Sequence, residues 1–314
     1  MIGATLILAC AVVAASPNKV HLMPRGFAEL SVAGDFRYTG GSYNDELFRY
    51  RLFVPRNRKS GERYPLLVWL HGCAEGGNDN ENNLKHLDMI LDDPNHIEKY
   101  RFFILAVQCQ SKETSWPGGY GEHDMLTVTH AVLQKTIQEQ PVDVDRVYLA
   151  GVSGGGSGSW EMAMRYPGLF AAVAPMASRG GDASRVANLI DVPIWAFHNL
   201  HDSGSPPKAV EEMATAVSQA GGNVFLTIEP AIGHDCWSSA FRQHHIMEWM
   251  LAQHRGAWIC WTPPGCHVWQ WWHILTVPIA SAILVGWGWH SERKRRGAKR
   301  RSSVPPESAA TPTG

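Results

Sequence analysis

Short apolar runs alternate with amphipathic segments along most of this chain. Six of the runs are rich in β-branched and aromatic residues and are bounded by turn-forming residues, which predicts buried strands. These strands are expected at residues 65–70, 102–107, 147–152, 171–174, 194–198 and 224–228. Helical patterns are found at residues 127–138, 160–166, 207–220 and 242–254. Strands that alternate with helices predict an α/β fold, in which helices cover both faces of a mostly parallel sheet.

Two more strands are predicted before this alternation begins. They lie at residues 36–38 and 47–54, and the stretch between them contains Gly40, Gly41 and Asn44. Because glycine and asparagine favour tight turns, the two strands are expected to form an antiparallel hairpin. The hairpin and the alternating elements together define a predicted domain at residues 20–255.

The start of the chain has the pattern of an export signal. Residues 1–16 are apolar and carry no charged side chain, and small residues occupy positions 13–15. An apolar segment followed by such a cleavage site is typical of a signal peptide. The competing interpretations are a wrongly set start of the chain and a disordered terminus.

The other end has the pattern of a membrane anchor. Residues 257–290 contain no Asp, Glu, Lys or Arg, and the stretch 268–289 is long enough to cross a bilayer as a helix. Tryptophans crowd both of its ends, and a basic, Pro- and Ser-rich tail follows at residues 290–314. Basic residues beside a span stay cytoplasmic, so the domain is expected outside the cytoplasm and the disordered tail inside. A buried helix and a wrongly read extension of the gene are the competing interpretations.

Composition excludes several other classes of protein. The 314 residues are 45% hydrophobic, which suits a globular core. Acidic residues outnumber basic ones before residue 256, so no nucleic-acid partner is expected. None of the six cysteines forms a C-x-x-C pair, which argues against a zinc site. Cys73 and Cys109 each follow a predicted strand and are expected either close together or as free thiols, and Cys260 with Cys266 are candidates to close a small loop.

The chemistry of the chain is indicated by Gly151-Val152-Ser153-Gly154-Gly155, a G-x-S-x-G sequence between a predicted strand and a predicted helix. In this motif the serine sits on a tight, strained turn, and the helix that follows directs its N–H groups toward a developing oxyanion. The alternative is a flexible linker, because residues 154–159 are all Gly or Ser.

A serine hydroxyl needs a base, and the base needs a carboxylate that fixes its tautomer. Asp202 lies in the loop after the predicted strand 194–198, and His234 follows a glycine in the loop after the strand 224–228. The order Ser153, Asp202, His234 is the one that α/β-hydrolases use. Asp235 is the rival acid, but a neighbour in sequence does not easily reach the imidazole ring.

An oxyanion hole requires two backbone N–H donors. One is expected from Gly154, directly after the nucleophile. The other is expected from Cys73, with Ala74 as the alternative, in the loop that begins at His71-Gly72 after a predicted strand.

These segments resemble one branch of the α/β-hydrolase superfamily, which contains predicted secreted peptidases, feruloyl esterases and polyhydroxybutyrate depolymerase-like esterases. The resemblance rests on residues 70–80, on Gln108-Cys109-Gln110 with Trp116, and on the nucleophile, acid and base segments, and it covers roughly residues 26–255. It implies a serine hydrolase with Ser153, Asp202 and His234 as its triad. The chain departs from the branch at Gly154 and Ser157, where methionine and tyrosine are typical, and at Asn199, where glycine is usual.

The expected activity is cleavage of carboxylic esters, of small molecules or polymers, through an acyl-enzyme and without a metal or cofactor. Trp116, Trp160 and Trp237 are candidates to line a pocket for an aromatic acid, although core packing explains each of them equally well. A serine peptidase of the prolyl oligopeptidase-like type is the alternative enzyme. A non-catalytic, membrane-tethered binding domain is the alternative outside enzymes.

Overall fold

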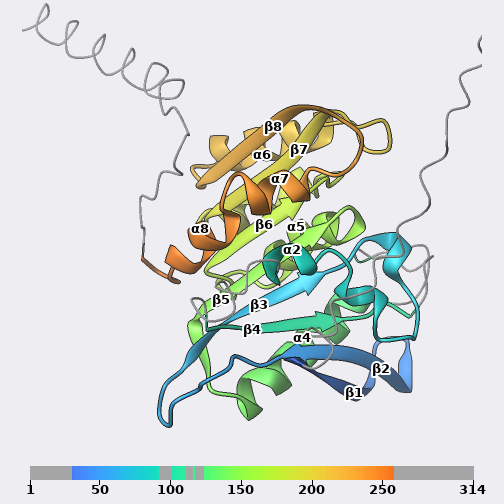
Figure 1. The fold of residues 1–314 in the computed structure, drawn as a ribbon. Coiled ribbons are helices and arrows are strands. Elements are labelled where there is room, and N and C mark those ends of the chain that lie inside the picture. The colour runs from blue at the N-terminus through green and yellow to red at the C-terminus, as the bar shows by residue number, and fades with distance from the viewer. Residues whose placement is uncertain (1–29, 92–100, 111–115, 117–123, 258–314) are drawn as a thin grey trace, which may run out of the picture. The chain divides into compact units, whose positions relative to one another are not determined.

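An eight-stranded sheet forms the centre of the protein in a computed structural model that describes residues 30–91, 101–110, 116 and 124–257 (Figure 1). The chain divides into two units, Met1–Trp261 and Thr262–Gly314, and every described residue belongs to the first. The predicted signal peptide, membrane span, basic tail and loop between Cys260 and Cys266 therefore lie outside the described residues. Within the described ranges, no helix has the length and apolar character needed to cross a bilayer.

The order of the strands in the sheet is β1-β2-β4-β3-β5-β6-β7-β8. The strands are β1 (Ser31–Gly40), β2 (Tyr43–Phe53), β3 (Tyr64–Leu70), β4 (Phe103–Val107), β5 (Val142–Val152), β6 (Ala172–Met176), β7 (Ile194–His201) and β8 (Val224–Ile232). From β4 to β8 all neighbours are parallel, whereas β1 with β2 and β2 with β4 are antiparallel. The predicted mostly parallel sheet and the N-terminal hairpin are thus confirmed.

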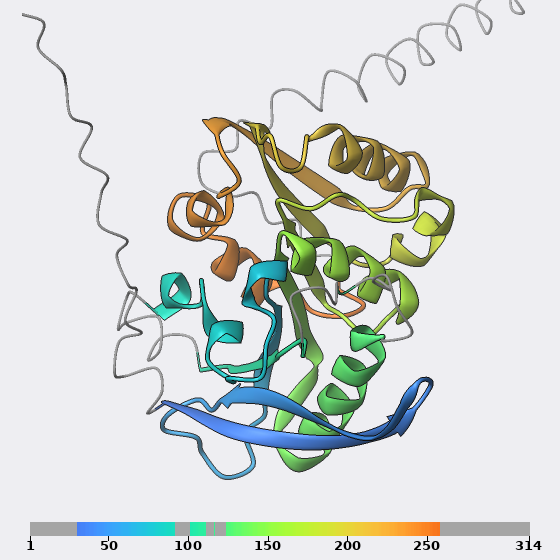
Figure 2. The same ribbon diagram turned by 90° about the vertical axis from the view of Figure 1, so that its right-hand side faces the viewer.

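Helices cover both faces of this sheet (Figure 2). They are η1 (Cys73–Glu75), η2 (Asn82–Leu84), α2 (Asp88–Leu91), α4 (Met125–Glu139), α5 (Gly154–Arg165), η3 (Ala183–Leu189), α6 (Lys208–Gln219), α7 (Trp237–Arg242) and α8 (Ile246–Ala252). Because strand side chains alternate between faces, Leu66 and Val68 of β3 pack with α4, α5 and α6, and Leu67 and Trp69 pack with α2, α7 and α8. Each such side chain is fully buried, which stabilises the fold by about 1.5–3 kcal/mol.

The last predicted helix, residues 242–254, is wrong in its bounds. The helix in this range, α8, is shorter, from Ile246 to Ala252, and a separate helix that was not predicted, α7, precedes it and ends at Arg242. His245 between them has left-handed backbone angles, with φ of 53°. The break allows Phe241 of α7 and Trp249 of α8 to pack against the same face of the sheet.

The strand β8 closes the sheet at one edge, with β7 as its neighbour. Between Val224 and Ile232 every side chain is at least partly exposed to solvent. This edge strand leads directly to the loop that contains His234.

Candidate active site

The nucleophile motif forms a sharp turn between β5 and α5. Ser153 has a φ of 56° and a ψ of −117°, a region that non-glycine residues rarely adopt. The glycines around it are required by space: a Cβ on Gly155 would lie 2.0 Å from the carbonyl oxygen of Leu70, and a Cβ on Gly151 would lie 2.3 Å from that of Gly155. The helix begins at Gly154, earlier than predicted, so the Gly- and Ser-rich stretch is helical and is no linker.

The structure brings the three predicted triad side chains together. The His234 Nε2 atom lies 2.8 Å from the Ser153 hydroxyl oxygen, and the His234 Nδ1 atom lies 2.5 Å from Oδ2 of Asp202. The three residues come from the carboxyl ends of β5, β7 and β8, which share one edge of the sheet. The imidazole can therefore accept a proton from the serine while the carboxylate holds the tautomer that this requires.

Asp202 is buried, with its side chain 1% exposed. Burial alone would raise its pKa, but hydrogen bonds from His234 and from the backbone N–H groups of Ser205 and Gly204, together with the charge of His234, hold the pKa below the usual value. The carboxyl is therefore ionised at neutral pH, as an orienting acid must be. The rival acid Asp235 accepts hydrogen bonds from the backbone and hydroxyl of Ser238 instead.

Asn199 links the acid strand to the histidine loop. Its side chain is buried, and its Nδ2 group donates to the carbonyl oxygen of Gly233 at 2.9 Å and to that of Asp235 at 3.1 Å. These two carbonyls flank His234 on either side. The sequence marked Asn199 only as a departure from the family, so its role as a clamp on the base was missed.

The predicted oxyanion donors lie at the starts of two helices. Cys73 opens η1 and Gly154 opens α5, and the first N–H groups of a helix have no partner within it. A Cβ on Gly154 would lie 3.4 Å from the backbone nitrogen of Cys73 and 2.3 Å from its sulfur atom, so the two loops are in close contact. The Cys73 thiol thus fills the space that a side chain at position 154 would need.

Buried polar contacts hold the loop that carries Cys73. Trp116 donates from Nε1 to the carbonyl oxygen of His71 at 2.7 Å. Glu75 is buried and pairs with Lys85 at 2.9 Å. Burial would raise the pKa of Glu75, but hydrogen bonds from His86 and Lys85 lower it to about 2. The ionised carboxylate of Glu75, which belongs to this loop, therefore anchors it to Lys85.

The described cysteines are free thiols. Cys73 is exposed at the site, and Cys109 is buried. Burial, with a smaller effect of nearby Cys73, raises the pKa of the Cys109 thiol, so this group is protonated and unreactive at neutral pH.

The predicted pocket role does not fit Trp116 and Trp160. They are 1% and 0% exposed, and the second donates from Nε1 to the Ser178 hydroxyl in the core. Both are structural residues, since a side chain without exposed surface cannot contact a substrate in this conformation. Trp237 is 8% exposed and stands edge-on to the His234 ring at 5.6 Å, so it supports the base.

A cavity of about 520 Å³ opens beside Ser153 and His234. Small residues such as Gly154, Ser157 and Ala177 form much of its wall. Its described lining includes no aliphatic side chain larger than alanine and none of the three tryptophans. The lining includes three charged residues that sequence reasoning did not single out, Glu161, Arg179 and Asp182.

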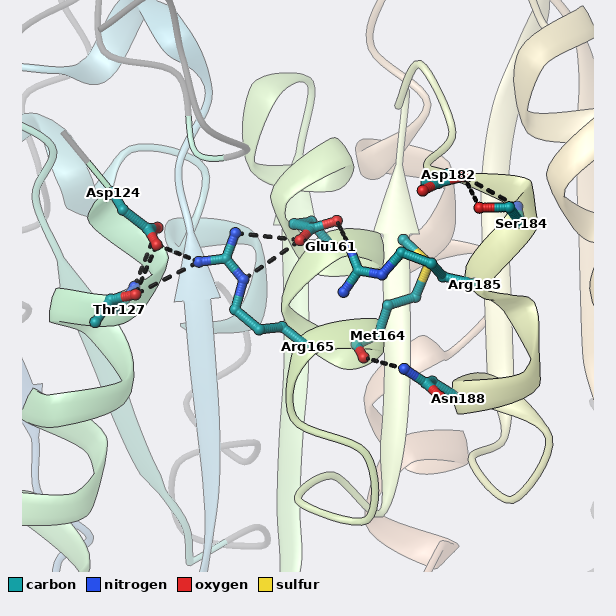
Figure 3. A network of polar contacts seen from close by, with 9 residues as sticks. All are labelled: Asp124, Thr127, Glu161, Met164, Arg165, Asp182, Ser184, Arg185 and Asn188. Carbon is teal, nitrogen blue, oxygen red and sulfur yellow. Dashed lines mark hydrogen bonds and ion pairs between the residues drawn. The ribbon is translucent and has the colours of Figure 1, made fainter. Parts of the chain in front are cut away.

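One of these charges is neutralised by a network behind the wall (Figure 3). Glu161 accepts hydrogen bonds from Arg165 at 3.1 Å and from Arg185 at 2.8 and 2.9 Å. Arg165 also pairs with Asp124, which caps α4. The carboxylate of Glu161 is therefore fully engaged inside the protein.

Comparisons with known proteins find esterases and a peptidase among the proteins similar to this chain. The family model Esterase PHB depolymerase matches residues 48–192. A thermostable esterase structure is similar at 28% identity and a TM-score of 0.66, over 72% of this chain and 64% of that one, so the chain spans less than two thirds of its length. A ferulic acid esterase structure has 17% identity and a TM-score of 0.57, over 70% of this chain and 97% of that one. The acylaminoacyl peptidase of Pyrococcus horikoshii has 14% identity and a TM-score of 0.55, over 75% of this chain and 44% of that one, and these two structures share the fold. No curated protein sequence matches the chain.

Proposed function

Because this chain belongs to the α/β-hydrolase superfamily of esterases and peptidases, we propose that it is a serine hydrolase that cleaves carboxylic esters. The observation that supports the proposal most directly is the unbroken chain of contacts from Ser153 through His234 to Asp202. Acyl transfer to a serine requires a nucleophile, a base within hydrogen-bonding distance of it, and a group that orients the base, and these three side chains are in those positions.

The reaction proceeds in two halves. The Ser153 oxygen attacks the ester carbonyl carbon while His234 takes the hydroxyl proton, and the N–H groups of Gly154 and Cys73 stabilise the oxyanion. Collapse of the tetrahedral intermediate breaks the bond to the alcohol, to which His234 returns the proton. Water then attacks the acyl-enzyme with His234 again as base, and the acid and free Ser153 are released. Asp202 stays ionised and orients the imidazole throughout.

Esters are preferred over peptides because the site is open. The His234 side chain is 37% exposed, and the adjacent cavity is lined by small residues. An amide is a harder substrate and depends more on binding remote from the reacting bond, which an open site provides poorly. The similarity to an acylaminoacyl peptidase keeps a peptidase as the alternative activity.

The test combines covalent labelling with kinetics. Ser153→Ala should abolish labelling by a fluorophosphonate and lower ester turnover by about 10³-fold or more, and Ser60→Ala, an exposed serine in the loop before β3, should change neither. The kcat/KM values for p-nitrophenyl acetate, p-nitrophenyl butyrate and methyl ferulate are compared with those for peptide amides. A higher value for an unactivated peptide than for every ester would favour the peptidase. A wild-type protein that neither reacts with the probe nor turns over any substrate would favour the non-catalytic binding domain.

We also propose that the enzyme is exported and anchored by the stretch 268–289, with its tail in the cytoplasm. The support is the uncharged, tryptophan-flanked sequence followed by basic residues. Protease added to spheroplasts should digest the hydrolase domain and spare the tail. Recovery of the full-length chain entirely in the soluble fraction would contradict the anchor.

A further inference from the structure

Arg179 places a cationic side chain in the wall of the cavity that also contains Ser153 and His234. It lies in the loop that follows β6, whose neighbour β5 carries the nucleophile. The residue is exposed, and its contacts with the rest of the protein determine whether its charge is available to a substrate.

The backbone of this loop is held in place. The Arg179 N–H group donates to the Ser157 hydroxyl at 3.0 Å, and the buried Ser178 hydroxyl accepts from Trp160. Gly180 has a φ of 72°, and a Cβ there would lie 2.7 Å from the carbonyl oxygen of Ala209. The backbone at Arg179 is therefore already ordered, so binding of a ligand would not have to order the loop.

Most N–H donors of the Arg179 guanidinium group form no hydrogen bond among the described residues. Its described contact is a long hydrogen bond from Nη2 to the carbonyl oxygen of Gly204, at 3.4 Å. Among the described residues, no carboxylate forms an ion pair with Arg179, although the guanidinium fork is suited to bind one in a bidentate manner.

The two carboxylates in the same wall are already occupied. Glu161 is shared between Arg165 and Arg185, and Asp182 accepts hydrogen bonds from the backbone and hydroxyl of Ser184 (Figure 3). Glu161 is thus paired with cations of the protein, whereas the Asp182 carboxylate is exposed and, within the part of the chain that the structure describes, bound only by the neutral donors of Ser184. Arg179 is the charged group of the described wall with the most capacity to bind a ligand.

The shape of the cavity fits the same interpretation. Gly154 and Ser157, both small, line the space next to the nucleophile together with Gly180, Gly181 and Gly204. The described wall contains no large aliphatic side chain and no tryptophan, tyrosine or phenylalanine against which a long aliphatic or aromatic acyl chain would pack. It does offer hydrogen bonds to a polar group.

We propose that the substrate of this enzyme is an ester that carries a carboxylate, and that Arg179 binds this carboxylate in the cavity beside Ser153. The inference rests on the proposed ester hydrolysis and names its substrate class. Arg179 is a specificity-determining residue in this reaction, because its contact favours anionic esters over neutral ones of the same size.

The experiment compares matched ester pairs. The acyl side is probed with p-nitrophenyl hydrogen glutarate against p-nitrophenyl valerate, and the alcohol side with 3-carboxyphenyl acetate against phenyl acetate. For at least one pair, the wild-type kcat/KM should be higher for the anionic ester. Arg179→Gln should lower that anionic-to-neutral ratio by about 10- to 100-fold, as expected for a hydrogen-bonded charge pair. Arg179→Lys should restore part of the ratio, and Arg56→Gln, an exposed arginine after β2, should leave it unchanged.

Several results would overturn the proposal. They are a wild-type preference for the neutral ester in both pairs, an unchanged ratio in Arg179→Gln, and an equal loss for both members of a pair, which would mean a structural role. If the wild type hydrolyses no ester, the proposed function fails, and calorimetric titration with glutarate still decides the carboxylate site. Binding to the wild type that is lost in Arg179→Gln would support the site, and equal affinity or no binding in both proteins would overturn it.

Discussion

Replacement of Asn199 by alanine should slow catalysis although this residue is not expected to touch the substrate. The Asn199 amide holds the two carbonyl groups on either side of His234, those of Gly233 and Asp235. Without it, the loop loses two of its hydrogen bonds to the end of β7 and keeps the one from the Gly233 N–H group to the His201 carbonyl oxygen. The imidazole then samples positions away from the Ser153 hydroxyl, which it now meets at 2.8 Å.

The size of the effect follows from these contacts. Each of the two hydrogen bonds contributes about 0.5–1.5 kcal/mol net, so Asn199→Ala should lower the free energy of unfolding by about 1–3 kcal/mol. A displacement of the base by about 1 Å is enough to lower the turnover rate by about 10²-fold. Because a mobile loop still visits the correct position for part of the time, kcat should fall about 10- to 100-fold while KM changes little.

The assay is steady-state hydrolysis of a p-nitrophenyl ester, together with urea unfolding of the same protein. Asn188→Ala is the matched control, because the Asn188 amide also donates to a backbone carbonyl, that of Met164 at 2.8 Å, but away from the triad. The control should lose about 0.5–1.5 kcal/mol of stability and keep its kcat. A folded Asn199→Ala protein with a kcat within about threefold of wild type, below the effect expected of a displaced base, would refute the clamp.

Two further predictions concern the frame of the site. Gly155→Ala places a methyl group 2.0 Å from the carbonyl oxygen of Leu70. The free energy of unfolding should therefore fall by about 1–3 kcal/mol or more, and activity should be lost. An unchanged midpoint of urea unfolding would contradict this prediction. Glu75 has its pKa lowered to about 2, so its stabilising effect is complete above its ordinary pKa and is lost as the pH falls toward 2. The stability difference between wild type and Glu75→Gln should therefore shrink by up to about 3 kcal/mol on acidification. A difference that stays constant between about pH 7 and pH 3 would argue against the ion pair between the buried Glu75 carboxylate and Lys85.

The parts of this protein that local patterns encode were predicted well. The strand β5 and its turn are a continuous run from an apolar segment into glycines, so both the fold and the position of Ser153 follow from neighbouring residues. The placement of Asp202 and His234 followed from chain order, because the carboxyl ends of parallel strands meet at one edge.

The missed features depend on contacts between distant segments. The Asn199 clamp joins residues more than thirty positions apart, and the Arg179 loop takes its position from Ser157. Periodicity gives no information on such partners. Trp160 shows the same limit, because its sequence pattern suits a core and a pocket equally, and its complete burial in the structure assigns it to the core. The helical periodicity of residues 242–254 likewise gives no sign of the left-handed backbone angles of His245 that separate α7 from α8.

The position of β8 at the edge of the sheet has a consequence for how the enzyme inactivates. The strand is hydrogen-bonded to β7 on one side, and each of its side chains is partly exposed, so it is expected to open at a lower free energy than the inner strands. Opening of β8 would withdraw His234 while Ser153, on the central strand β5, keeps its turn. As urea increases, hydrolysis should therefore disappear before buried tryptophans that do not contact β8, such as Trp69 and Trp160, become exposed. In hydrogen exchange, the amides of β8 should exchange faster than those of β5, so the base would be the member of the triad that is lost and recovered most often.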